Sequence, residues 1–148
     1  MWNRSKSLML SIFSTRLFAL LIILGVIMAP SVVRWYFGFS GGTESQVWPF
    51  CVIIYVSSVP AFALLYCLHL LLLHIRSGDA FIVQNVTLLR AISWCCFTIA
   101  VITFSAGFYY APFFLVAVAA LFIALILRVI KNVFEQAIEM KSENDFTI

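Results

Sequence analysis

Three long stretches of this sequence contain no Asp, Glu, Lys or Arg, and they constrain the fold more than any other feature. They cover residues 17–33, 47–75 and 91–127. An α-helix needs roughly 20 apolar residues to cross the ~30 Å hydrocarbon core of a bilayer. The runs therefore predict helices that span a membrane, and their composition argues against a soluble domain, in which about a quarter of the residues are charged.

The last of these stretches is too long for one crossing. As a single helix, residues 91–127 would measure about 55 Å at ~1.5 Å per residue. Gly107 and Pro112, which flank two tyrosines, are the residues expected to break it. The sequence thus predicts a single all-α membrane domain over residues 1–148, a four-transmembrane-helix bundle. The expected spans are 17–33, 47–75, 91–107 and 112–127.

The first stretch is longer than the apolar core of a signal peptide, which has about 7–15 residues. We therefore expect it to remain in the protein as a membrane anchor. The preceding segment, Ser7 to Arg16, is apolar enough to begin the helix early. This leaves open whether Arg16 lies within the edge of the bilayer, where a long side chain ordinarily snorkels to the interface.

The positive charges predict the orientation, because Lys and Arg concentrate in cytoplasmic loops. Arg34 is the only basic residue between the first and second spans, whereas all others lie before the first span, between the second and third, or after the fourth. Both termini and the connection 76–90 are therefore expected in the cytoplasm. Aromatic residues are placed to line the opposite interface: Trp35, Tyr36, Trp48, Tyr109 and Tyr110.

The connection between the second and third spans, residues 76–90, is a long polar segment. Gly78 is expected to end the preceding helix at its C′ position, and Asp79 to cap a new helix. Apolar residues then recur at spacings of four and three, at Ile82, Val86 and Leu89. The pattern is typical of a short amphipathic helix that lies at the interface and runs into the third span, with or without a binding role.

The residues after the fourth span, 128–148, are expected to continue its helix into the cytoplasm. From Arg128 onward the segment has three basic and four acidic residues, whereas helices adsorbed on anionic lipid usually have a basic polar face. An apolar stripe keeps helical spacing at Ile130, Val133, Phe134, Ala137 and Met140. The stripe is expected to be covered by the connection 76–90, by a second copy of the chain or by another protein, and these alternatives stay open.

Residues that carry chemistry are scarce in the spans. The spans contain no Asp, Glu or Lys of the kind that proton-coupled carriers need. His69 and His74 are five residues apart and do not share a helix face, and the four cysteines lack C-x-x-C spacing. We therefore expect no catalytic, cofactor or metal site, and the net charge of +3 is too scattered for direct nucleic-acid binding.

Two short motifs resemble a known family. Gly78-Asp79-Ala80-Phe81, with Asn85, Leu89 and Arg90 downstream, is similar to the bacterial membrane-protein family called domain of unknown function 2975. The ending Glu143-Asn144-Asp145-Phe146-Thr147-Ile148 is similar to the family's terminus, with Phe146 where Leu is commoner. The resemblance covers nearly the whole chain. It implies a four-span protein of the bacterial inner membrane without an established activity, and a helix-turn-helix regulator as a candidate cytoplasmic partner.

These observations favour a non-catalytic regulatory or interaction module that acts through its cytoplasmic face. The alternative is an oligomeric passive pore or small transporter, lined by Ser57, Ser58, Thr98, Thr103 and Ser105. The expected partners are the lipid bilayer, a regulator and a further copy of the chain. The candidate interaction surface lies where segments 79–90 and 128–148 meet and comprises Gly78, Asp79, Phe81, Asn85, Leu89, Arg90, Phe134, Glu143, Asn144 and Asp145.

Overall fold

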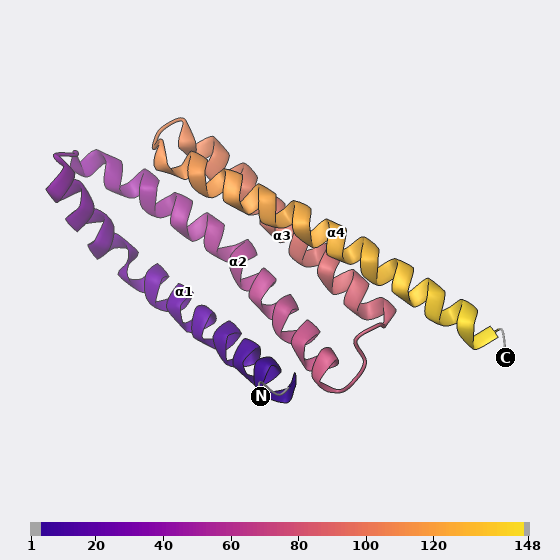
Figure 1. The fold of residues 1–148 in the computed structure, drawn as a ribbon. Coiled ribbons are helices and arrows are strands. Elements are labelled where there is room, and N and C mark those ends of the chain that lie inside the picture. The colour runs from indigo at the N-terminus through magenta and orange to yellow at the C-terminus, as the bar shows by residue number, and fades with distance from the viewer. Residues whose placement is uncertain (1–3, 147–148) are drawn as a thin grey trace.

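The computed structural model describes residues 4–146, which form an all-helical chain (Figure 1). Each of its four long helices is long and apolar enough to cross a membrane. A 3-10 helix, η1 (Glu44–Gln46), precedes the second of them. The long helices are α1 (Arg4–Ser40), α2 (Val47–Arg76), α3 (Val83–Gly107) and α4 (Pro112–Phe146). The described chain is therefore a multi-pass membrane protein, as its charge-free runs predict.

The helices lie side by side in chain order, so that the predicted bundle is an open row (Figure 1). α1 packs against α2, α2 against α3, and α3 against α4. In the described residues no Cα atom of α1 lies within 8 Å of one in α3 or α4. The row therefore leaves broad apolar faces uncovered by the protein, and these suit contact with lipid.

Both ends of the described chain lie at the same end of the row, beside the connection between α2 and α3 (Figure 1). We call this the terminal end. The opposite end, which carries the α1–α2 and α3–α4 connections, is called the hairpin end. A buried apolar cluster lies toward each: Leu71, Leu89 and Ile92 toward the terminal end, and Val33, Phe37, Val47 and Cys51 toward the hairpin end.

Small side chains allow α3 and α4 to approach closely. Ala100 and Ala106 of α3 and Ala117 and Ala124 of α4 are all buried. Ser93 adds a bond between the helices, since its hydroxyl donates to the carbonyl of Ala124 at 3.0 Å. Lipid tails are as apolar as Leu, so close packing and interhelical hydrogen bonds carry helix association in a membrane. The α3–α4 pair uses both.

The helices extend well beyond the spans predicted from hydropathy. α1 begins at Arg4 and includes the segment from Ser7 to Arg16 without a break, and it also continues past Arg34 to Ser40. α4 runs from its apolar part straight into the predicted extension and ends at Phe146. Terminal residues 147 and 148 of the predicted extension lie outside the described residues.

The break between the last two helices lies where the sequence predicts it. α3 ends at Gly107 and α4 begins at Pro112. Gly107 is required by packing, because a Cβ added there would lie 2.6 Å from a ring carbon of Phe114. The absence of a side chain at Gly107 therefore allows the first turn of α4 to pack closely against the last turn of α3.

Candidate functional site

The predicted interaction surface lies at the terminal end, where the α2–α3 connection meets the last third of α4. α2 ends in a Schellman motif, as expected for a glycine at C′. Gly78 has a φ of +96°, its amide donates to Ile75 at 3.3 Å, and the amide of Asp79 donates to the carbonyl of His74 at 3.1 Å. The connection therefore turns sharply away from α2 at these residues.

Asp79 does not cap the next helix, which corrects the expectation from sequence. α3 begins four residues later at Val83, and its N-cap residue is Ile82, which has no side-chain cap. The Asp79 carboxylate instead lies 3.5 Å from the hydroxyl of Ser77. The Schellman turn uses the Asp79 amide, and this places its side chain beside the end of α2 rather than at the start of α3.

Asn85 holds the connection from the inside. Its side chain is fully buried, at 0% exposure. The amide nitrogen Nδ2 donates to the carbonyls of Asp79 at 2.9 Å and Ala80 at 2.7 Å. Its oxygen Oδ1 lies 2.7 Å from Nδ1 of His74. One side chain thus satisfies two carbonyls of the loop and joins them to the last turn of α2.

The bonds of Asn85 also indicate that Nδ1 of His74 is a donor. The two carbonyls accept only from an NH₂ group, so the amide cannot be flipped and Oδ1 must face the imidazole. Oδ1 is an acceptor, and His74 Nδ1 therefore carries a proton.

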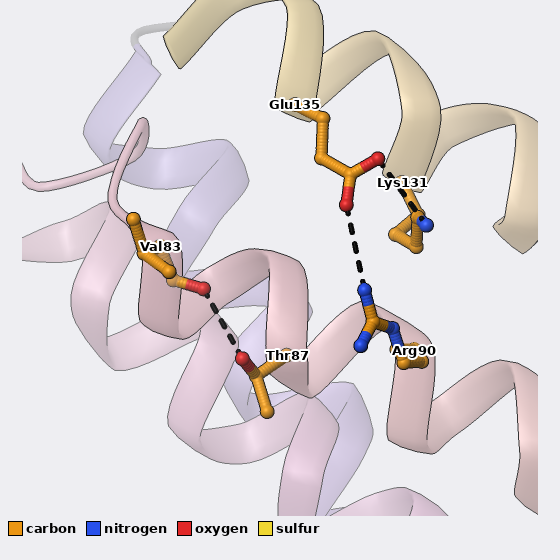
Figure 2. Close-up of polar contacts among 5 residues, drawn as sticks. All are labelled: Val83, Thr87, Arg90, Lys131 and Glu135. Carbon is orange, nitrogen blue, oxygen red and sulfur yellow. Dashed lines mark hydrogen bonds and ion pairs between the residues drawn. The ribbon is translucent and has the colours of Figure 1, made fainter. Parts of the chain in front are cut away.

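The apolar spacing predicted in the connection belongs to the first turns of α3, which run without a break into the span. Val86 and Leu89 are buried, whereas Gln84 and Thr87 are exposed. The Thr87 hydroxyl donates to the carbonyl of Val83 at 3.3 Å (Figure 2). The apolar side of these turns therefore packs against protein, and no separate interfacial helix precedes α3.

Two of the predicted surface residues are internal. Asn85 is enclosed by the connection, and Leu89, at 3% exposure, packs with Leu71 and Ile92 in the terminal-end cluster. Neither side chain can form part of an exposed interaction surface, which corrects the expectation for both.

Phe81 and Phe134 join the connection to α4. Their ring centroids are 5.3 Å apart, within the range of favourable aromatic pairs. Phe81 remains about half exposed, whereas Phe134 also packs against the terminal-end cluster. The connection of the same chain, one of the three predicted covers for the α4 stripe, therefore reaches Phe134.

An ion-pair cluster continues this contact along the two helices. Glu135 lies between Arg90 of α3 and Lys131 of α4 (Figure 2). Its carboxylate oxygens are 3.5 Å from Arg90 and 3.3 Å from Lys131. The Arg90 side chain is 56% exposed and that of Glu135 39%, so solvent screens the pair and its contribution to stability is modest.

The rest of the predicted stripe is not covered. Ile130, Val133 and Met140 are exposed, and only Phe134 and Ala137 are half-buried. Lys131 is better covered than Val133, because the α4 face that meets α3 is rotated from the predicted stripe. The last predicted surface residues, Glu143, Asn144 and Asp145, are exposed in the final turns of α4.

The hydroxyls proposed as a pore lining bond largely to their own helices. Thr98 donates to the carbonyl of Trp94, Ser105 to that of Val101 and Ser58 to that of Tyr55. Thr103 is buried and donates to Ile99 at 2.7 Å. Ser57 Oγ is buried and has no hydrogen-bond partner within the described residues. These side chains therefore do not line a common polar path in one chain.

Within residues 4–146, no three His, Cys, Asp or Glu side chains are close enough together to hold a metal ion. The polar contacts that sequence reasoning missed include His74–Asn85 and, at the hairpin end, the bond from the Tyr110 hydroxyl to the carbonyl of Gln46 at 3.0 Å. The contact between His74 and Asn85 could have been anticipated, because the two residues are close in sequence, on either side of the Gly78-Asp79 turn. No comparable signal exists for the second, whose residues are far apart in sequence.

Comparison with known proteins gives one match. No curated protein and no solved structure matches this chain. A family model described as "Protein of unknown function (DUF2975)" matches residues 41–148, which begin just after α1 and include η1, α2, α3 and α4. Because this match covers more than half of the chain, the protein belongs to the DUF2975 family, whose function is unknown.

Proposed function

We propose that this protein is a non-catalytic regulatory or interaction module whose working surface is the terminal end, on the cytoplasmic side of a bacterial inner membrane. The main support is the docking of α4 onto the connection in the same chain, through Phe81 and Phe134. This contact gives the α4 extension a fixed direction. It also leaves another side of the extension open.

That open side has the chemistry of a binding surface. Beyond Arg128, Val133 and Met140 are more than half exposed. Next to them, the last turns carry Glu139, Glu143 and Asp145 against Lys141. Apolar groups rimmed by charge are typical of protein contacts. The excess of acidic groups favours a protein partner with a basic surface over anionic lipid.

The cytoplasmic placement rests on the distribution of Lys and Arg. The terminal end carries every basic residue except Arg34, which lies toward the hairpin end. Reporter fusions test this placement. A fluorescent protein fused after residue 148 should be bright and alkaline phosphatase there inactive, whereas phosphatase inserted after Gly41 should be active. The reverse pattern would move the proposed surface to the outside.

The interaction itself is tested by photo-crosslinking in native membranes. A photoreactive amino acid at Gln136, exposed on the α4 extension, should give a defined protein adduct, and Glu143→Lys should weaken it. The matched control is the same probe at Leu125, which is exposed in the α4 span and should react with lipid. Identical adducts at both positions, together with ion flux through purified protein in liposomes, would contradict the module and favour the pore alternative.

A further inference from the structure

An exposed arginine without an acidic partner among the described residues lines a cavity between α1 and α2. The cavity measures about 290 Å³ and is lined by Thr15, Arg16 and Ala19 of α1 and by Phe62, Leu65, Tyr66 and His69 of α2. Arg16 forms no ion pair with any of the described residues. No acidic partner is near among the described residues, because neither helix contains an Asp or Glu and no Cα atom of α1 lies within 8 Å of one in α4.

The depth of Arg16 places it at the boundary of the bilayer. Arg16 and Arg34 lie on one continuous helix, about 27 Å apart at ~1.5 Å per residue. This distance is close to the ~30 Å thickness of the hydrocarbon core. If Arg34 lies at one boundary, Arg16 lies at the other, at the level of the lipid phosphates. Arg16 is exposed, and an arginine side chain at this level can reach the lipid phosphates by snorkelling.

His69 supplies a second donor to the cavity. Its Nδ1 atom is buried and has no hydrogen-bond partner in the described residues. Nε2 is therefore the ring nitrogen that can act toward the cavity, and a proton on Nε2 makes it a donor. The Tyr66 hydroxyl, on a side chain that is 64% exposed, adds a third donor one turn away.

We propose that this cavity binds the phosphate group of an anionic phospholipid. Arg16 contributes the charge, His69 Nε2 and the Tyr66 hydroxyl contribute hydrogen bonds, and the acyl chains lie along Ala19, Phe62 and Leu65. The apolar lining below the donors favours a lipid over a free phosphate ion, which has no apolar part. This inference does not depend on the proposed interaction of the α4 extension.

The test measures lipid retained by the purified full chain. After delipidation, phosphatidylglycerol, phosphatidylcholine or inorganic phosphate is added, and bound lipid is counted by native mass spectrometry. Phosphatidylglycerol should be retained, and Arg16→Gln should weaken its binding by about tenfold or more, the usual scale for a charge-assisted contact. Arg34→Gln, the same change on the same helix outside the cavity, should leave this retention unchanged. His69→Phe should weaken retention to a smaller extent.

Helical content and thermal unfolding in detergent without lipid show whether each variant folds. Equal retention by folded Arg16→Gln and Arg34→Gln proteins would overturn the proposal. Retention of phosphatidylcholine as strong as that of phosphatidylglycerol would also overturn it. Displacement of the lipid by inorganic phosphate would show a soluble anion site and would overturn the assignment to lipid.

Discussion

The two ends of the molecule are held together by different chemistry. At the terminal end, one buried amide, that of Asn85, bonds to two loop carbonyls and to His74. At the hairpin end, aromatic rings from α1, α4 and the α3–α4 turn pack around Phe50 of α2, whose ring lies 5.0 Å from those of Tyr110 and Phe113 and 5.7 Å from that of Phe37. The terminal end is held mainly by hydrogen bonds, which are directional, whereas the hairpin end is held mainly by the fit between packed aromatic rings.

The difference follows from the backbone at each end. Residues 77–82 between α2 and α3 leave carbonyls that no helix pairs, and buried carbonyls need partners. The α3–α4 turn is shorter and pairs its own groups, since the amides of Tyr109 and Tyr110 both donate to the carbonyl of Ala106. The hairpin end therefore needs no buried amide, and ring packing, together with the bond from the Tyr110 hydroxyl to the carbonyl of Gln46, positions its helices.

The largest expected effect is at Asn85. Asn85→Leu keeps the approximate volume but leaves two carbonyls and the Nδ1–H of His74 without partners. At about 1–3 kcal/mol for a buried unpaired group, partly relieved by loop movement, we expect a loss of about 2–4 kcal/mol in the free energy of unfolding. Unfolding in mixed micelles followed by circular dichroism measures it. Amide exchange in residues 77–82 should become faster.

The control for this prediction is Gln84→Leu, the same chemical change at the adjacent exposed position. It should alter stability by less than about 0.5 kcal/mol. If both variants lose the same stability, Asn85 does not organise the connection, and the contrast between the ends disappears.

A smaller loss is expected from Phe50→Ala at the hairpin end. In a soluble core, the change would cost about 3–5 kcal/mol. In a membrane, lipid can fill the space and the burial gain between helices is small, so we expect about 1–3 kcal/mol. Phe39→Ala is the matched control, because Phe39 is 87% exposed and its removal should have little effect. Equal losses would indicate that the ring cluster does not hold this end.

The smallest effect concerns the ion pair between Arg90 and Glu135. A double-mutant cycle with Arg90→Ala and Glu135→Ala should give a coupling energy below about 1 kcal/mol, because both side chains are well exposed. High salt should reduce the coupling further. A coupling of several kcal/mol that resists salt would show that this pair, and not the Phe81–Phe134 contact, fixes the α4 extension.

The residues of the predicted interaction surface show which features of it the sequence could and could not predict. The glycine signal at Gly78 predicted the end of α2, because a positive φ is a local property of the backbone. The apolar spacing in residues 128–140 predicted the covered face of α4 only in part, since Phe134 packs against the terminal-end cluster, whereas Val133 and Met140 are exposed and better-covered Lys131 lies outside the stripe. Asn85 was predicted to lie at the surface because it is polar. A polar residue type alone does not indicate that its hydrogen-bond partners lie within the connection.

The sequence by itself determined the number of helices, their breaks and their membrane character, because span length, glycine and proline act locally. Only the tertiary structure decided that the helices form an open row, that Asn85 faces inward, and that Arg90 meets Glu135. In a membrane, the side chains that face lipid and those that face protein are both apolar, so periodicity alone cannot tell them apart. Their assignment depends on contacts between residues far apart in the chain.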